Sequence, residues 1–367
     1  MLGLLKIIVA QSNVKVCLVF PKILDRKIRI GVVGCGRISK NHFSAIEKHQ
    51  DDIELVSVCD VDENALSSHR NSNVNCYTRM SDMLTSENLD LVSLCTPSGF
   101  HPDEVVLAAK NNINVMTEKP MATRWQDGIR MVRACDEAGV RLFVVKQNRR
   151  NATLQLLKKA LDAKRFGSIY MVQVNVFWTR PQEYYDSAKW RGTWELDGGA
   201  FMNQASHYID LLDWLIGPVA DVQAMTGTLA RDIEVEDSGV MNIRWRNGAL
   251  GSVSVTMLTY PKNLEGSITI LGEKGSVRIG GVAVNEVEHW EFEDNQDYDV
   301  QVKDASYVTT SVYGFGHPLY YKNVIDVMRG TAEPETDGRE GLKSLELLVA
   351  TYLSARDGKT ISLPLEY

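Results

Sequence analysis

The first part of the sequence alternates between two kinds of hydrophobic pattern. Short runs of consecutive apolar residues are separated by longer stretches in which apolar residues recur every three or four positions. Continuous runs are typical of strands buried on both faces, and the longer stretches are typical of amphipathic helices. The pattern therefore predicts a parallel sheet with helices on both faces. We expect strands at 28–33, 53–59, 89–95, 114–117 and 141–145, and helices at 40–48, 64–69, 80–85, 102–111 and 125–138.

The pattern changes after about residue 149, where strands come to dominate. The pair Asn247 and Gly248 lies between two of these strands and is a strong signal for a hairpin turn. Strands joined by such turns predict a largely antiparallel sheet, and hence a second domain of the α+β class. We expect its strands at 169–178, 221–229, 238–246, 249–257, 266–271, 276–280 and 287–292, and its helices at 152–163, 200–215, 317–329 and 339–355.

The 367 residues suit two domains, which the change of pattern places at 28–148 and 149–367. Residues 1–27 are expected to be an N-terminal extension outside the functional fold. Their apolar run is too short to span a bilayer, and Lys6 interrupts it. The sequence Ala-Gln-Ser that follows the run resembles a signal cleavage site, so export stays an alternative.

Charge and cysteine usage narrow the function classes. The net charge is −7, which argues against a protein that binds nucleic acid in bulk. No other stretch is apolar and long enough for a membrane span. The six cysteines show no metal-ligand spacing, so we expect reduced thiols, no metal site and a cytoplasmic protein.

A glycine turn follows the first predicted strand and runs directly into a helix. Gly34 allows a tight turn, Gly36 allows close approach of a pyrophosphate, and Ser39 stands where a third glycine is common. The helix start offers free N–H groups and the positive end of its dipole. Asp60 ends the second strand, 24 residues after Gly36, where a carboxylate accepts hydrogen bonds from ribose hydroxyls. This combination predicts NAD rather than NADP.

Two further strand ends carry polar residues that can reach the same crevice. Thr96 and Pro97 follow the third strand, with His101 shortly after, and Glu118 and Lys119 follow the fourth. In an open parallel sheet, ligands bind outside the carboxyl ends of the strands. Lys119 precedes a proline, which favours an extended backbone and aims the side chain away from the sheet. We therefore expect its ammonium group beside the cofactor.

The second domain contributes a polar helix face and an aromatic loop. Asn203 and His207 are four residues apart on a predicted helix that is otherwise apolar, with Gln204 beside them. The loop before it combines cations with aromatic rings, which suit a nucleotide base and phosphates, although an oligomer interface uses the same residues. The candidates are Arg180, Tyr184, Trp190 and Arg191 in this loop, and Gln147 and Arg149 at the domain junction.

These motifs, in this order, resemble the glucose–fructose oxidoreductase/inositol dehydrogenase/rhizopine-catabolism family over about residues 28–367. The segments 189–194, 199–207, 227–233 and 337–346 are similar to the UDP-N-acetylglucosaminuronate 3-dehydrogenases within it. The resemblance implies a Rossmann-type NAD-binding domain, a substrate domain and a homotetramer. It implies cofactor contacts from Gly34, Gly36, Arg37, Ile38, Asp60, Thr96, Pro97, His101, Glu118, Lys119 and Gln147. It implies substrate contacts from Lys119, Arg149, Arg180, Tyr184, Trp190, Arg191, Asn203, Gln204 and His207.

The implied reaction is oxidation of the 3-hydroxyl of a UDP-linked N-acetylated aminouronic acid with NAD, in bacterial surface polysaccharide synthesis. His207 is expected to be the general base, Lys119 to stabilise the same oxygen, and Asn203 to orient the sugar. A base role for Lys119 stays open. Many relatives have Asp in place of Asn203, and an amide does not raise a histidine pKa as a carboxylate does. Some relatives regenerate NAD with 2-oxoglutarate.

Two alternatives remain at the level of the sequence. One is a dehydrogenase of another sugar or polyol with the same fold, such as an inositol dehydrogenase. The other, of a different class, is a catalytically idle protein that senses NAD, because fold alone does not determine function. The presence of both Lys119 and His207 speaks against the second.

Overall fold

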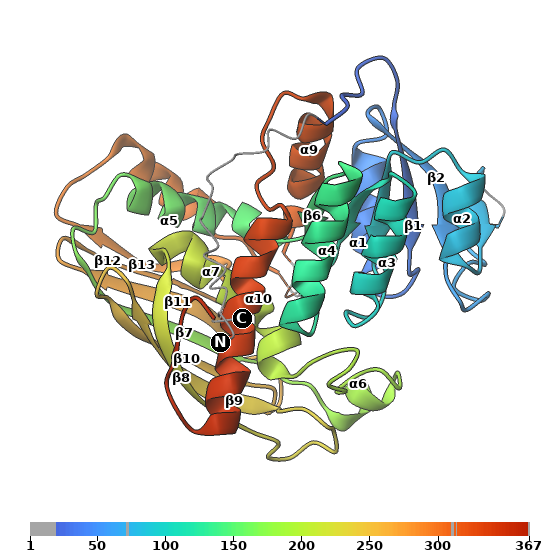
Figure 1. Ribbon diagram of the computed structural model, residues 1–367. Coiled ribbons are helices and arrows are strands. Elements are labelled where there is room, and N and C mark those ends of the chain that lie inside the picture. Colours follow the sequence, from blue (N-terminus) through green and yellow to red (C-terminus); the bar gives the residue numbers. More distant parts are fainter. Residues whose placement is uncertain (1–19, 71–72, 310–311, 313, 366–367) are drawn as a thin grey trace, which may run out of the picture.

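The computed structural model describes residues 20–70, 73–309, 312 and 314–365 (Figure 1). Its first sheet has six strands in the order β3-β2-β1-β4-β5-β6, and every neighbouring pair is parallel. The order changes direction between β1 and β4, which creates a crevice at the carboxyl ends of the strands. The strands are β1 (Ile28–Val33), β2 (Ile53–Cys59), β3 (Asn75–Tyr77), β4 (Leu91–Leu94), β5 (Asn114–Thr117) and β6 (Leu142–Val144).

Helices cover both faces of this sheet, as its apolar strands require. One face packs against α1 (Ser39–Lys48) and α9 (Gly316–Arg329), and the other packs against α3 (His101–Lys110) and α4 (Trp125–Ala138). The short helix α2 (Met80–Ser86) lies near the β3 edge. Helix α9 comes from the C-terminal part of the chain, so the first domain is completed by residues about 170 positions beyond its last strand (Figure 1).

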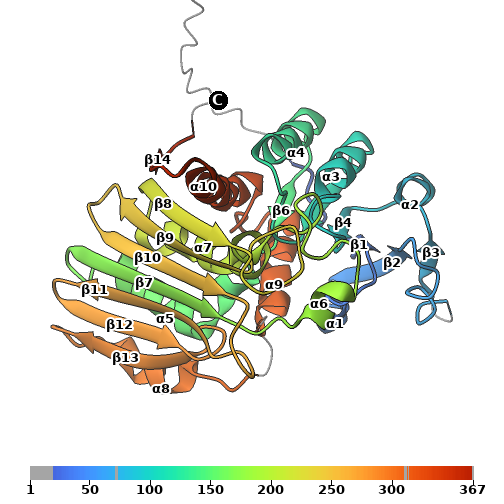
Figure 2. The ribbon, with the colours of Figure 1, turned by 90° about the horizontal axis from the view of Figure 1, so that it is seen from below.

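The second sheet has eight strands in the order β13-β12-β11-β7-β10-β9-β8-β14. Only the pair β7–β10 is parallel, and the long connection that a parallel pair requires contains helices and the strands β8 and β9. Helices α5, α7 and α10 lie against one face, as Figure 2 shows. The strands are β7 (Ile169–Phe177), β8 (Val219–Gly227), β9 (Ser238–Trp245), β10 (Leu250–Thr256), β11 (Glu265–Gly272), β12 (Gly275–Gly280), β13 (Glu286–Phe292) and β14 (Ile361–Ser362).

The remaining helices connect or cover these elements. The long ones are α5 (Ala152–Asp162), α7 (Ser206–Ile216) and α10 (Gly338–Asp357), and α10 also packs on α4 and β6 of the first domain. The short ones are α6 (Gln182–Asp186), α8 (Val302–Ala305), the 3₁₀ turns Gln147–Arg150 and Asp297–Gln301, and the π-helical turn Ala200–Gln204. Among the helices described, none is long and apolar enough to cross a bilayer.

The predicted α/β class and the two kinds of sheet are confirmed, with most elements within two residues of their expected bounds. Three expectations about elements are wrong. Residues 64–69 form turns rather than a helix, because the side chains of Asp60 and Asp62 accept hydrogen bonds from backbone N–H groups two residues ahead. The strand β3 was not expected. The predicted helix 200–215 is two pieces, a π-helical turn and then α7.

The N-terminal extension falls mostly outside the described residues, which begin at 20. Residues 20–27 run along α9, where the Ile23 N–H donates to the Met328 carbonyl oxygen. The Arg329 side chain donates to the carbonyl oxygens of Ile23 and Arg26. The domain limits at 27/28 and 148/149 stay predictions.

Candidate active site

One cavity of about 760 Å³ lies at the carboxyl ends of the first sheet and reaches the second domain. Parallel strands bring their carboxyl ends to one edge, so the turns after β1, β2, β4 and β5 all face it. Thirteen of the predicted site residues line this cavity. They are Gly34, Gly36, Arg37, Ile38, Asp60, Thr96, Pro97, Glu118, Lys119, Tyr184, Trp190, Arg191 and Asn203.

The glycine turn has the geometry that a phosphate site requires. Gly34 has φ of 87°, and a Cβ there would lie 2.7 Å from the carbonyl carbon of Cys95. A Cβ at Gly36 would meet no atom within 4 Å, so this backbone is open to a ligand. Asp60 supports the turn, since its Oδ2 accepts from the Cys35 N–H at 2.7 Å. These residues fit NAD, because the open backbone, the start of α1 and a carboxylate line one cavity.

Lys119 lies where the two domains meet. Its Nζ donates to the backbone oxygen of Asn203 at 3.0 Å and to the Oδ1 of the same residue at 3.4 Å. Burial disfavours the ammonium and lowers the pKa of Lys119 to about 8, and the nearby charges of Lys146 and Arg180 act in the same direction. At neutral pH an appreciable fraction of this amine is therefore unprotonated.

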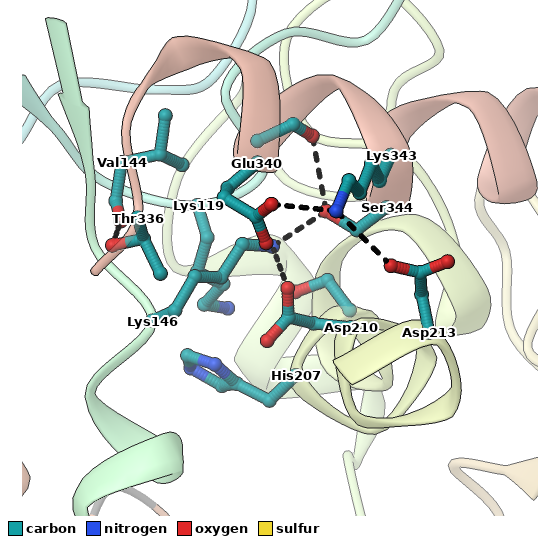
Figure 3. Close-up of polar contacts among 12 residues, drawn as sticks. Lys119, Val144, Lys146, His207, Asp210, Asp213, Thr336, Glu340, Lys343 and Ser344 are labelled. Atoms are coloured by element: carbon teal, nitrogen blue, oxygen red, sulfur yellow. Dashed lines mark hydrogen bonds and ion pairs between the residues drawn. The ribbon is translucent and has the colours of Figure 1, made fainter. Parts of the chain in front are cut away.

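His207 lies behind the cavity wall rather than on it. The imidazole is 4% exposed, and its Nε2 is 3.1 Å from the side-chain nitrogen of Gln147. Its Nδ1 has no hydrogen-bond partner among the described residues. Burial and the positive charges of Lys119 and Lys146 hold the pKa of His207 well below its usual range. Figure 3 shows Lys119, Lys146 and His207 gathered beneath the start of α10.

A buried ion-pair network adjoins His207. Arg149 donates from Nε and Nη2 to the two carboxylate oxygens of Asp210 at 2.7 and 2.8 Å, and its Nη1 lies 3.3 Å from Glu340. Lys146 donates from Nζ to Ser344 at 2.8 Å and lies 3.7 Å from Asp210 (Figure 3). Arg149, expected to touch substrate, is thus turned toward α7 and α10. Its substrate contact stays a prediction that this geometry does not support.

The aromatic loop forms the far wall of the cavity. The Arg191 guanidinium lies 4.4 Å from the ring centres of both Tyr184 and Trp190, and it donates to the Tyr184 hydroxyl at 2.7 Å. Arg180 and Gln204 do not line the cavity but support Tyr184 from behind. Arg180 donates from Nε to Gln204, whose amide nitrogen donates to the Tyr184 hydroxyl at 3.1 Å. These contacts fix the tyrosine ring on the wall.

Two predicted cofactor residues, His101 and Glu118, have side chains engaged in structural hydrogen bonds, although Glu118 also lines the cavity. The ring nitrogens of His101 lie 3.1 Å from the Pro120 oxygen and 3.0 Å from the Thr96 oxygen. The Glu118 carboxylate accepts from the Nε2 of His42 at 3.0 Å and from the Nε2 of His317 at 3.4 Å. It also accepts from the backbone N–H of Lys119, which ties the lysine to α1 and α9. Both cofactor roles stay predictions.

The cluster of His42, Glu118 and His317 also has the composition of a metal site. In the part of the chain that the structure describes, it is the one group of three or more ligand atoms within 4.8 Å of one another. Its two Nε2 atoms already donate to Glu118. Although burial would raise the pKa of Glu118, the hydrogen bonds from the histidines bring it well below its usual range. A buried ion pair explains the cluster without a metal.

Sequence reasoning missed several residues of the cavity wall. Thr78, Arg79 and Ser81 line it because they follow β3, which the sequence did not indicate. Asp197 also lines it, where the charges of Arg191 and Lys119 act on its carboxylate, which accepts from the Asn203 amide. The Gly198-Gly199 pair directly after Asp197 was the available signal, since such a pair at a helix start marks a close approach.

Both halves of the chain match a described protein family. Residues 28–146 match the oxidoreductase family NAD-binding Rossmann fold of the Gfo/Idh/MocA group, and residues 158–363 match its C-terminal alpha/beta domain. The chain belongs to the Gfo/Idh/MocA oxidoreductase family. This membership confirms the family resemblance, and the protein is an oxidoreductase with NAD as its cofactor.

Within the family, two solved structures are very similar to this chain. The WlbA dehydrogenase from Chromobacterium violaceum, in complex with NADH and UDP-GlcNAcA, is 66% identical, with a TM-score of 0.92 over 95% of this chain and 99% of that chain. The Bordetella pertussis WlbA dehydrogenase, with the same two ligands, is 65% identical, with a TM-score of 0.92 over 94% and 100%. D-apiose dehydrogenase from Paraburkholderia graminis is 25% identical over 92% of this chain and 90% of its own length.

Proposed function

We propose that this Gfo/Idh/MocA protein oxidises the 3-hydroxyl of UDP-GlcNAcA, with NAD as hydride acceptor. One observation carries the proposal. A single cavity joins the glycine turn and Asp60 on the cofactor side to Lys119, Asn203 and the aromatic loop on the substrate side. The 66% identity to a WlbA dehydrogenase bound to NADH and UDP-GlcNAcA supports the choice of substrate. A place in the synthesis of bacterial surface polysaccharide (O-antigen) is part of the same proposal.

The chemistry needs one hydride and one proton to leave the sugar. When bound, NAD accepts the hydride. Lys119 is well suited to accept the hydroxyl proton, because its amine lines the cavity and its pKa is lowered to about 8. The backbone and side-chain oxygens of Asn203 hold that amine in place. His207, the base expected from the sequence, stays the alternative, since its Nδ1 makes no hydrogen bond to any residue that the structure describes.

The far wall supplies groups that suit a nucleotide sugar. The rings of Tyr184 and Trp190 offer faces for stacking, and the Arg191 fork suits phosphate or carboxylate. Arg180 and Gln204 would act through Tyr184, which they hold by hydrogen bonds. Gln147 would act through His207 in the same way.

The direct test is turnover of the proposed substrate. Purified protein is incubated with UDP-GlcNAcA and NAD, and mass spectrometry looks for loss of two hydrogens at the sugar. A parallel reaction contains 2-oxoglutarate, since a tightly held NADH that this acid reoxidises would limit the first reaction to one turnover. A Lys119→Met variant is the matched inactive control, and myo-inositol and D-apiose test the neighbouring specificities. Absence of a 3-keto product in both reactions would overturn the proposal.

We also propose a homotetramer that pairs through the open face of the second sheet. No described helix covers this face, which is the one opposite α5, α7 and α10 (Figure 2). Large apolar side chains are exposed on it, and such patches mark interaction sites. They are Met171, Met225, Val240, Leu250 and Leu271. Light scattering at micromolar concentration should give a tetramer, and a monomer would contradict this.

A cytoplasmic location is proposed on chemical grounds. The five described cysteines are all free, which suits a reducing compartment. Cell fractionation that finds the protein outside the cytoplasm would contradict the proposal.

A further inference from the structure

Asp197 is a buried carboxylate on the cavity wall that the proposed chemistry does not use. It is 2% exposed and lies directly before the glycine pair that opens the π-helical turn. One oxygen, Oδ2, accepts from the Gly192 N–H at 2.7 Å. The other, Oδ1, accepts from the Asn203 side-chain amide. The residue is therefore held from both sides while it faces the same cavity as Lys119.

These contacts form a chain of three side chains that ends at the amine. Lys119 donates to the Asn203 side-chain oxygen, and the amide nitrogen of Asn203 donates to Asp197. A carboxylate only accepts hydrogen bonds, so Asp197 takes the NH₂ end of the amide and turns its oxygen toward Lys119. With the opposite orientation, the amide NH₂ would face the lysine, which has no acceptor to offer while charged. Without Asp197, only Lys119 would determine how the Asn203 side-chain amide is oriented.

Asp197 and Lys119 each favour the charged form of the other side chain. Burial raises the pKa of Asp197 to about 6, against the hydrogen bond from Gly192 and the charges of Arg191 and Lys119. The carboxylate is therefore mostly ionised at neutral pH, and its charge favours the protonated form of Lys119. The ionisable groups that act on Lys119 are Glu118, Lys146, Asp197 and Arg180, with the imidazoles of His207 and His317 beside it.

We propose that Asp197 is a positioning residue for Lys119: through the Asn203 amide it orients the amine over the cavity, and its negative charge stabilises the ammonium that forms when this amine takes the hydroxyl proton. The inference rests on the proposed role of Lys119. It assigns to Asp197 a function that neither the glycine turn nor the aromatic loop provides.

Two substitutions test this proposal in opposite directions. Asp197→Asn keeps the volume but removes the charge, so the pH at which Lys119 loses its proton should fall by up to about one unit. Asn203→Asp brings a carboxylate directly to the amine, so that pH should rise. Glu195→Gln is the matched control, because Glu195 is exposed, lies two residues away and carries the same charge. Glu195→Gln should leave the pH at which Lys119 loses its proton unchanged.

The first readout does not depend on turnover. Protein without substrate is pulse-labelled with acetic anhydride across a pH series, and the acetylation rate of Lys119 is followed by peptide mass spectrometry. Only the neutral amine reacts, so the midpoint of the rate against pH reports its protonation. The expected order of midpoints is Asp197→Asn below wild type and Asn203→Asp above it. A midpoint in Asp197→Asn equal to that of wild type would overturn the proposal, whatever the midpoint of Asn203→Asp.

The second readout separates orientation from binding. In Asp197→Asn, kcat at the pH optimum should fall about tenfold, because the amide that holds the amine can rotate. The KM for NAD should stay within about twofold, since Asp197 is on the substrate side. A change in KM for NAD without a change in kcat would contradict a positioning role. If Lys119→Met itself remains active, the proposed base role of Lys119 fails, and if wild type gives no 3-keto product the proposed function fails; in both cases the labelling midpoints still decide whether Asp197 and Lys119 are coupled.

Should Asp197→Asn fail to fold, Asp197→Ser removes the same charge with a smaller side chain and takes its place. A midpoint in Asp197→Ser equal to or above that of wild type would then overturn the proposal. Thermal unfolding of each variant establishes that it is folded before labelling.

Discussion

The pH dependence of kcat/KM should reveal which residue accepts the hydroxyl proton. The pKa of Lys119 is lowered from 10.5 to about 8 by burial. At pH 7 an amine with a pKa of about 8 is neutral about one time in ten, whereas one at 10.5 is neutral about one time in 3,000. The protein thus increases the reactive form about 300-fold at neutral pH. We expect kcat/KM to rise with pH, to reach half of its plateau near pH 8 and to level off near pH 9.

The pH range over which kcat/KM rises, the acidic limb of the profile, distinguishes Lys119 from His207 as the base. His207 has a pKa well below 6.5, so a histidine base would place the limb well below that value. Replacing Lys119 by arginine keeps the positive charge but removes a group that can lose its proton near neutral pH. Lys119→Arg should therefore lower kcat/KM by about 10²–10⁴-fold and abolish the limb. His207→Asn should keep it.

The assay is initial-rate NADH formation between pH 5.5 and 9.5, with UDP-GlcNAcA and NAD as substrates. Lys110→Arg is the matched control, because it makes the same exchange at an exposed position at the end of α3. NADH fluorescence titration checks that both variants still bind cofactor. If the limb persists in Lys119→Arg and disappears in His207→Asn, the roles are reversed. Near wild-type rates in both variants would refute the site itself.

Three further predictions concern the cofactor, the buried charges and pH stability. Asp60→Ala should lower the NAD/NADP ratio of kcat/KM at least about tenfold, because the carboxylate repels a 2′-phosphate; an unchanged ratio would exclude this role. Arg149→Met should reduce the free energy of unfolding by about 3–5 kcal/mol, since it leaves Asp210 buried without its bidentate partner. Adding Asp210→Leu should restore part of the loss in a denaturant titration. Burial raises the pKa of Glu236 from 4.5 to about 7, so the native state keeps a proton that the unfolded chain releases. Its contribution to stability should fall as pH rises from about 4.5 to 7, and Glu236→Gln should flatten that part of the melting temperature profile; a profile of equal slope in both proteins would contradict this.

Features that depend only on neighbouring residues could be predicted before the structure was known. The turn of Gly34 and Gly36 could be predicted because only a few residue types allow that backbone, and the period of apolar residues indicated each long helix and strand. Asp60 and Lys119 could be placed on one crevice because parallel strands bring their carboxyl ends together. The hairpin at Asn247 and Gly248 follows from local turn chemistry in the same way.

The tertiary structure alone decided what depends on residues far apart in the chain. His317 meets Glu118 only because α9 returns to pack on the first sheet, and no local pattern encodes that return. Arg149 is turned away from the cavity because Asp210 offers it a bidentate partner in the protein interior, where an unpaired charge is costly. The π-helical turn lets Asn203 reach both Lys119 and Asp197, a geometry that the four-residue spacing of a regular helix does not reveal. The local sequence determines steric preferences of the backbone, whereas the packing of the whole chain determines which residues pair with buried charges.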